Sequence, residues 1–444
     1  MPGRSYRTGR GRRPDDIGVP ARALGGPSIN PLSRSAIMSP SISPSAHWAS
    51  GLAALLLLAG GAGASRASDH FDTSGLNADP RADIGDVYAW TDPAGHRLNL
   101  VMTVVGHSFS ERLSYVFHID SGAAFGQITA STDITCRFAA KLADCRVGTV
   151  DRATGDATGE RGLEGRRHRF RVFTGLRDDP FFFNAPGSAA AMAVAGAALK
   201  AGATKDGAGC AQFDAATPAG IQDAWSHTKG GPATNFLAGF TPASIVISVD
   251  LKAVDRGGPL LAVWGATVSP TRQVDRAGRP LTSTFLLAPL GAPEVVDKLR
   301  DDYNGAAPTD WARFIPAIRE SLSFFDALDG QCGNGLLESA AEDTPQRYQA
   351  LAALMADDRI WVNSASTTCA EPYAVERAAH GGGPALAQDC GGRTLTYSSV
   401  NVFRSLMAGG KPTGIDDGLN QDELTPSNSA FPFLRPPPGG VAKP

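Results

Sequence analysis

Short segments in the first half of the chain alternate hydrophobic and polar residues or are rich in β-branched and aromatic residues. The clearest runs from His168 to Thr174, where Phe170 and Val172 fall on one face and arginines on the other, as in a half-buried strand. β-Branched and aromatic enrichment favours strands elsewhere. We predict further strands at residues 86–90, 98–105, 113–120, 243–251 and 260–267, the last two as a central pair.

The second half of the chain changes to helical spacing. From Thr309 to Leu328 a Thr-Asp cap precedes large apolar residues three or four positions apart, which predicts a helix. We also predict helices at 293–303, 344–357 and 398–408, and either a helix or a flexible insertion at the alanine-rich stretch 188–203. Strands followed by helices predict an α+β fold. It would be one large β-rich domain, a sandwich or a barrel, decorated by helices mainly in the C-terminal half.

The N-terminal region has the features of an export signal. An apolar run from Leu52 to Gly61 precedes A-x-A-like sites that end at Ala64 and Ala67. About ten apolar residues are too few to span a bilayer of about 30 Å, so the pattern predicts a signal peptide. Met38 is an alternative start. We therefore divide the chain into an extension with signal peptide (1–67), one domain (68–438) and a flexible tail (439–444), and expect a periplasmic or extracellular protein.

Composition and charge narrow the class of protein. Of 444 residues, 42% are hydrophobic and 19% are charged, which is typical of a globular protein. Eight arginines lie in the first 67 residues, so the remainder carries 33 basic and 42 acidic residues, a net charge of −9. This argues against nucleic-acid binding, which depends on neutralising phosphates. No later stretch is apolar for about 18 residues, so we expect no integral membrane segment in the mature chain.

All six cysteines follow the predicted cleavage sites. An even number in an oxidising compartment predicts disulfides, although many pairings are possible. Spacing favours Cys136–Cys145, in a short loop between strand-like segments, and Cys369–Cys390, which would close a Gly/Pro-rich loop. Cys210 and Cys332 would then form the third bond.

Several motifs occur in an order that resembles the DUF4331 family of exported bacterial proteins. They are found at Ser68–Thr73, Asn77–Trp90, Tyr115–Asp120, Phe173–Phe183, Gln273–Pro280, Cys390–Thr394 and Phe431–Leu434. The resemblance implies a DUF4331-like domain over residues 68–438. It implies no activity, because no catalytic residue or ligand is established for the family. Many members have an Asp/Gly-rich turn after the strand that ends here at Asp120; this chain has Ser121-Gly122-Ala123-Ala124 instead, so the resemblance does not imply a calcium site at that turn.

Acids and histidines form the first candidate sites. The sequence contains no P-loop, H-E-x-x-H, G-x-S-x-G or EF-hand motif. Carboxylates suit a divalent cation such as Ca²⁺, and imidazole suits Zn²⁺ or Cu²⁺. Two residues of one strand that lie two positions apart share a face, as His118 and Asp120 would. The alternative is that the acids form turns and caps, and that the His–Asp pair is a satisfied polar contact. The candidate metal ligands are Asp69, His70, Asp72, Asp83, Asp86, His118 and Asp120.

Two other acidic motifs favour structural interpretations. Asp178 and Asp179 precede Pro180, and we interpret them as a turn in which Arg177 bridges a carboxylate. Residues 416–423 have the composition of a calcium loop without its spacing, and we interpret them as a solvated loop.

Cleavage after Ala67 would create the N-terminus Ser68-Asp69-His70. Its amine, two amides and imidazole can form a square-planar nitrogen site, which selects Cu(II).

The sequence thus predicts an exported, non-enzymatic binding or structural protein of unknown ligand, whose partner is a metal ion, a small molecule or a surface. The alternative is a metal- or carboxylate-dependent hydrolase, which would need titratable groups that converge in one pocket.

Overall fold

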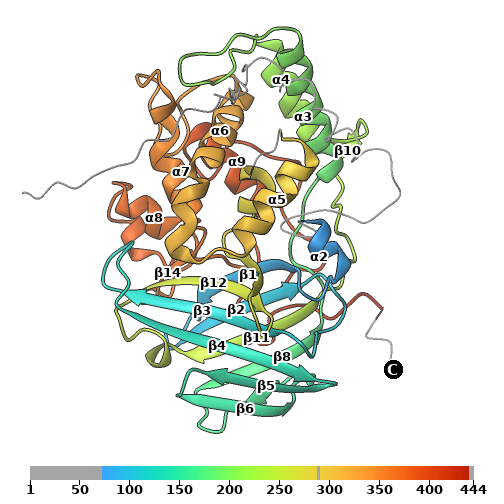
Figure 1. The fold of residues 1–444 in the computed structure, drawn as a ribbon, viewed down its shortest axis with the longest axis vertical. Coiled ribbons are helices and arrows are strands. Elements are labelled where there is room, and N and C mark those ends of the chain that lie inside the picture. The colour runs from blue at the N-terminus through green and yellow to red at the C-terminus, as the bar shows by residue number, and fades with distance from the viewer. Residues whose placement is uncertain (1–72, 288–290, 440–444) are drawn as a thin grey trace, which may run out of the picture. The chain divides into compact units, whose positions relative to one another are not determined.

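Two large antiparallel sheets dominate the computed structural model, which describes residues 73–287 and 291–439 (Figure 1). The five-stranded sheet has the order β1 (Ile84–Thr91), β2 (Arg97–Val104), β11 (Ala243–Asp250), β8 (Phe170–Leu176), β7 (Leu163–Glu164). The seven-stranded sheet has the order β13 (Gln273–Ala277), β12 (Leu260–Val268), β3 (Ser114–Gly122), β4 (Ala130–Ala139), β5 (Leu142–Val147), β6 (Asp151–Asp156), and β14 (Ile360–Asn363) also pairs with β12. A small hairpin joins β9 (His227–Thr228) and β10 (Gly231–Pro232).

The two large sheets pack face to face. A Cβ atom added to Gly265 of β12 would lie 2.6 Å from Cε of Met102 and 2.9 Å from Cγ2 of Val87, so β12 lies directly against β1 and β2. Side chains of both sheets share one buried apolar cluster. The predicted α+β, β-rich domain is therefore confirmed as a sandwich, and the sheets do not close into a barrel.

The predicted strands are present, but one predicted pairing is wrong. Residues 243–251 form β11 between β2 and β8, whereas residues 260–267 form β12 in the other sheet. The short connection between them, which includes the 3₁₀ turn η2 (Leu251–Ala253), carries the chain from one sheet to the other. Both strands are buried almost throughout, so their sequences look alike although they are not neighbours.

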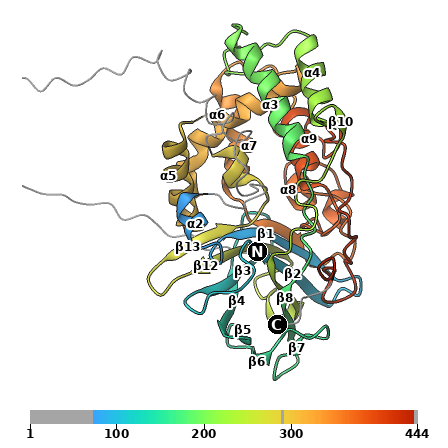
Figure 2. The same ribbon diagram turned by 90° about the vertical axis from the view of Figure 1, so that its right-hand side faces the viewer.

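Helices gather at one side of the sandwich, mostly from the second half of the chain (Figure 2). The predicted helix at 309–328 is a 3₁₀ segment followed by an α-helix, because Pro316 has no N–H to continue the α-helical ladder. The stretch 188–203 is helical as far as Lys200 and is not a flexible insertion. The α-helices are α2 (Ser74–Ala78), α3 (Ala185–Lys200), α4 (Ala216–Trp225), α5 (Pro293–Asn304), α6 (Ile315–Asp326), α7 (Gln349–Ala356), α8 (Ala374–Ala379) and α9 (Ser399–Gly409). Shorter 3₁₀ or π segments are η3 (Thr282–Leu286), η4 (Pro308–Phe314), η5 (Ala327–Asp329), η6 (Pro345–Tyr348) and η7 (Leu386–Gln388).

Three disulfides staple this fold with the predicted pairing. They join Cys136 to Cys145, Cys210 to Cys332 and Cys369 to Cys390. All described residues belong to one compact unit. Within the described ranges, no helix is both long and apolar enough to cross a membrane. The predicted signal peptide and its cleavage sites lie outside the described residues.

Candidate functional site

Asp83 and Asp86 lie at the start of β1 and are almost completely buried, with 0% and 1% of their surface exposed. Asp86 Oδ1 lies 2.5 Å from Nη2 of Arg393, so an arginine neutralises this carboxylate. Since Val87 faces the seven-stranded sheet, the side chain of Asp86 points to the opposite face of its own sheet.

His118 and Asp120 share one face of β3, as predicted, and it is the face directed away from the five-stranded sheet. The His118 ring stacks on Trp264 with 3.9 Å between ring centres, and its Nδ1 lies 2.8 Å from Oδ1 of Asp133. Asp120 accepts hydrogen bonds from Ser131 Oγ at 2.6 Å and from Arg359 Nη1 at 2.9 Å. These polar groups satisfy one another and do not meet Asp83 or Asp86. Asp69, His70 and Asp72, and with them the predicted copper site, lie outside the described residues.

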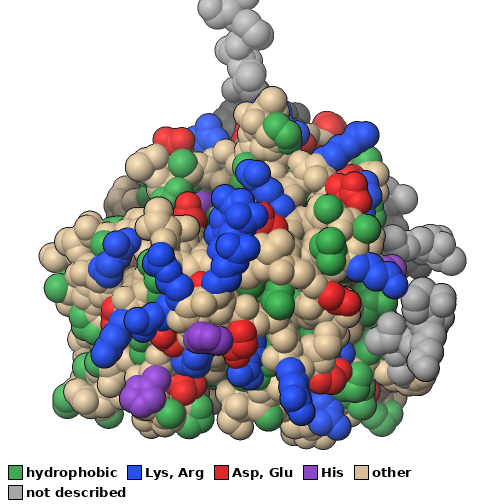
Figure 3. Space-filling view, turned by 90° about the horizontal axis from the view of Figure 1, so that it is seen from below, with side chains coloured by type: hydrophobic (Ala, Val, Ile, Leu, Met, Phe, Trp, Pro, Cys, Tyr) green, Lys and Arg blue, Asp and Glu red, His purple; other side chains and the backbone are tan. Residues whose placement is uncertain are grey.

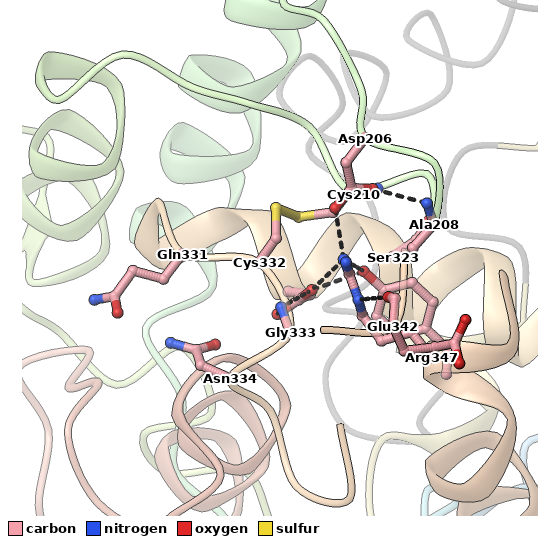
Figure 4. A network of polar contacts seen from close by, with 12 residues as sticks. Asp206, Ala208, Cys210, Ser323, Gln331, Cys332, Gly333, Asn334, Glu342 and Arg347 are labelled. Atoms are coloured by element: carbon pink, nitrogen blue, oxygen red, sulfur yellow. Dashed lines mark hydrogen bonds and ion pairs between the residues drawn. A yellow bond between two sulfur atoms is a disulfide. The ribbon is translucent and has the colours of Figure 1, made fainter. Parts of the chain in front are cut away.

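Among the described residues, one set of three metal-ligand types has atoms within 4.8 Å of one another: Asp206, Cys210 and Cys332. Figure 4 shows the two sulfurs joined in a disulfide, and Asp206 accepting hydrogen bonds from backbone N–H groups and from Arg347. Because disulfide sulfurs do not bind metals as thiolates do, this set is a structural network.

A buried acid pair lies beside that network. Asp326 is fully buried and accepts hydrogen bonds from Tyr348 Oη and from the backbone N–H of Gly333, both at 2.7 Å. Burial, together with the nearby charge of Asp326, raises the pKa of Glu338 to about 9. The folded protein therefore keeps a proton on Glu338 at neutral pH, whereas an unfolded chain loses it near pH 4 to 5.

We expect Glu338→Gln to gain stability relative to the wild type as the pH rises from about 5 to about 8. A raised folded-state pKa stabilises the protein below the unfolded pKa, and that stability is lost as pH rises toward the folded value. Glutamine has no proton to lose, so the variant escapes this loss. Urea unfolding at both pH values checks the result, with the exposed Glu320→Gln as control. An equal difference in unfolding free energy at both pH values would contradict it.

The two acidic motifs that the sequence separates come together in the structure. Asp178, which follows β8, and Asp422, in the C-terminal segment, are only 5% and 6% exposed. Their carboxyl groups share a hydrogen bond, and Asp422 shares another with Glu423. Nδ2 of Asn235 donates to Asp422 Oδ1 at 3.1 Å and to Glu423 Oε2 at 3.0 Å. We call Asp178, Asp422 and Glu423 the carboxyl cluster.

These positions correct two interpretations of the sequence. Arg177 does pair with a carboxylate, but its partner is Glu160, with Nη2 to Oε1 at 2.8 Å. Arg177 therefore does not form an ion pair with the carboxyl cluster. Residues 416–423 are not a solvated loop throughout, because Asp417 and Asp422 are buried. No pattern in the sequence indicates a contact between Asp178 and Asp422, which lie more than 200 positions apart. They meet because the C-terminal segment passes close to the residues that follow β8.

Two acids of the carboxyl cluster, Asp178 and Asp422, have pKa values well above the usual range of an aspartate. Burial is the main cause, and it raises the pKa of Asp178 to about 6 and that of Asp422 to about 9. The neighbouring acids raise both values further, except that the hydrogen bond from Asp422 lowers that of Asp178. Within the described part of the chain, no Arg, Lys or His nitrogen lies within 4.0 Å of these three carboxyl groups.

Buried hydroxyl groups lie on the nearby face of the five-stranded sheet. Asp86, Thr103 and Ser244 are register partners across β1, β2 and β11, so their side chains line up on one face. Thr103 Oγ1, Ser244 Oγ and Tyr88 Oη are buried without a hydrogen-bond partner in the described structure. The charge of Asp422 contributes to the raised pKa of Tyr88, whose main cause is burial. The Tyr88 hydroxyl group is therefore close enough to Asp422 to interact with it electrostatically.

Many charged side chains elsewhere pair with one another. Figure 3 shows arginine and lysine side chains gathered on the molecule as seen from below, with acids among them. Arg152 pairs with Asp144 at 2.7 Å and Arg171 with Glu164 at 2.5 Å. Such exposed pairs contribute little to stability and need no ligand.

Comparison with protein-family models, curated proteins and solved structures finds no match for this chain.

Proposed function

We propose that this protein is an exported, non-enzymatic binding protein that holds a Ca²⁺ ion at the carboxyl cluster. The observation that carries the proposal is the burial of Asp178 and Asp422 with a hydrogen bond between their carboxyl groups. Bringing two carboxyl groups together away from water is costly unless a proton or a cation neutralises them. A divalent cation would replace the protons and remove this cost.

The donor atoms favour Ca²⁺ over a transition metal. The cluster offers only oxygen, which suits Ca²⁺ or Mg²⁺, and no imidazole or free thiolate. Ca²⁺ tolerates irregular coordination better than Mg²⁺ does. In the structure the three carboxyl groups do not all have oxygens within 4.8 Å of one another. Binding therefore requires Glu423, which is exposed, to move inward.

The unpartnered hydroxyl group of Tyr88, which lies near Asp422, and those of Thr103 and Ser244 on the same sheet face support the same proposal. An unpaired buried hydroxyl costs about 1–3 kcal/mol, so most such groups have a partner. Three of them on one sheet face beside acids indicate that a polar species belongs there. A hydrated cation satisfies acids and hydroxyls together.

We expect calorimetric titration of CaCl₂ into chelator-treated mature protein to show one site with a Kd of about 0.1–1 mM, the range of extracellular calcium modules. Asp422→Asn should weaken binding at least about tenfold, because it removes a charged ligand. Asp255→Asn is the matched control. Burial raises the pKa of Asp255 as well, but no second acid contributes to that shift, so its removal should leave binding unchanged.

The titration should also release protons. Since Asp422 is protonated at neutral pH, Ca²⁺ must displace its proton, and the affinity should rise with pH between about 6 and 9. Titrations in two buffers of different ionisation enthalpy measure the released protons. No binding at millimolar Ca²⁺, or equal binding by Asp422→Asn and the wild type, would refute the proposed site.

A further inference from the structure

Asn235 contacts the two acids of the carboxyl cluster that lie in the C-terminal segment. It lies in the loop after β10 and is half-buried. Its Nδ2 donates one hydrogen bond to Oδ1 of Asp422 at 3.1 Å and another to Oε2 of Glu423 at 3.0 Å. Among the described residues, no other side-chain nitrogen donates to either acid. Since one nitrogen atom makes both hydrogen bonds, it holds the two carboxyl oxygens side by side.

The oxygen of the same amide fixes its orientation. Oδ1 accepts the backbone N–H groups of Phe183 and Leu237, both at 3.1 Å. An asparagine amide offers two donors and two acceptor lone pairs, and this amide uses all four. If the amide were flipped, its N–H groups would point at these two backbone N–H groups. The side chain therefore presents both of its donors to the acids in a single orientation.

The loop of Asn235 is fixed to the part of the chain that carries the third acid. Phe183 lies in the segment after β8, which also contains Asp178, and its carbonyl accepts the N–H of Phe236 at 2.9 Å. Backbone and side-chain hydrogen bonds thus join the loop to that segment. The other two acids of the cluster belong to a segment that has no helix or strand of its own. Asn235 therefore fixes their position relative to Asp178.

Glu423 is the acid whose position depends most on this contact. Its side chain is exposed, whereas Asp422 is only 6% exposed. An exposed glutamate samples many rotamers, and ordering it around a ligand costs conformational entropy. The hydrogen bond from Asn235 restricts Glu423 before an ion arrives.

We propose that Asn235 is the positioning residue of the cation site: its amide holds an oxygen of Asp422 beside one of Glu423 and so determines how tightly the carboxyl cluster binds Ca²⁺. The inference rests on the proposed function and adds a residue that does not itself touch the ion. A carboxylate oxygen that accepts one hydrogen bond keeps a lone pair for a cation. Groups that donate hydrogen bonds to metal ligands orient them, and their loss weakens metal binding about 10- to 100-fold.

Asn235→Ser tests this role with little change to the loop. A serine hydroxyl can accept the N–H two residues ahead, as the Asn235 oxygen does from Leu237. It ends one bond short of the amide nitrogen, so it removes both donors from the acids. We expect calorimetric titration of CaCl₂ into chelator-treated mature protein to show binding at least about tenfold weaker for Asn235→Ser than for the wild type.

Asn401→Ser is the matched control. Asn401 is also half-buried, its Oδ1 accepts the N–H of Asp417 at 3.0 Å, and its Nδ2 donates to Oδ1 of Asp416 at 3.2 Å. It fixes the same C-terminal segment through the same kind of contacts, but it donates to no acid of the carboxyl cluster. Its replacement should leave the affinity for Ca²⁺ unchanged. Equal weakening by both variants would mean that a looser segment, and not the position of the acids, reduces binding.

The wild type gives a second, spectroscopic readout that needs no variant. Because Glu423 has to move inward when Ca²⁺ binds, the side-chain ¹⁵N–¹H₂ signals of Asn235 should shift during the titration, whereas those of Asn401 should not. Asn235→Ser with the affinity of the wild type, or Asn235 signals that stay in place while Ca²⁺ binds, would overturn the inference and leave the calcium site standing. A wild type that binds no Ca²⁺ would refute the proposed function, and the inference with it.

Discussion

Arg393→Met is expected to lower the free energy of unfolding by about 3–5 kcal/mol, because it breaks a buried ion pair by removing one partner. Arg393 is 1% exposed, and its Nη2 lies 2.5 Å from Oδ1 of Asp86. Its Nη1 donates to the carbonyl of Val87 at 3.0 Å and its Nε to Ser399 Oγ at 3.2 Å. One side chain thus links β1 to the first turn of α9.

The cost comes mainly from the acid that stays behind. Methionine fills much of the space over the ring of Tyr88, which the guanidinium now covers at 4.0 Å, but it leaves the charge of Asp86 without its arginine. Asp86→Asn in the same chain should therefore recover part of the loss. Urea unfolding of the wild type, both single variants and the double variant measures this coupling.

Arg313→Met is the control for the loss of an arginine from an aromatic ring. Arg313 is exposed, lies 4.8 Å from the ring centre of Phe314 and has no acid partner among the described residues. Its replacement should cost less than about 1 kcal/mol. A cost of that size for Arg393→Met, or no recovery in the double variant, would mean that the ion pair does not stabilise the packing of α9 on β1.

Replacing both cysteines of the Cys210–Cys332 disulfide with alanine should lower the free energy of unfolding by about 5 kcal/mol. The same change at Cys136–Cys145 should lower it by about 3 kcal/mol. The first bond closes a loop with a sequence separation of 122 residues, and the second one of only 9. A long loop restricts the unfolded chain more than a short one does. The long bond also ties the region before α4 to the segment after η5, which no other covalent link joins.

Urea unfolding of the two double variants, each with the other two bonds intact, measures the difference. The short bond is the control, because it also lies in the packed interior, at two buried cysteines, but joins adjacent strands that already pair through their backbones. Cys210 is likewise buried, whereas Cys332 is half-buried. An equal or larger cost for the short bond would show that packing, and not chain entropy, determines the contribution of the disulfides.

The sequence alone determined most of the local structure. Alternation at residues 168–174 predicted β8, and the predicted helix at 398–408 is α9, which begins after Ser398, whose Oγ accepts from the N–H of Asn401. These features depend on side chains a few positions apart, which is why a linear pattern reveals them. β4 was missed, because Thr, Asp and Arg alternate with its buried residues and weaken the hydrophobic signal. The disulfide pairing also followed from spacing.

Only the tertiary structure decided which distant residues meet. The sequences of β11 and β12 do not indicate which sheet each strand joins, because strands that are buried on both faces are apolar throughout in either sheet. His118 and Asp120 share a face of β3, but the packing of the sheets decided that this face is the outer one. Asp178 meets Asp422, and Arg404 lies on Trp225, because the fold brings together segments that are far apart in the sequence. Burial, which gives these charged groups their chemistry, is a property of that assembly and not of any single segment.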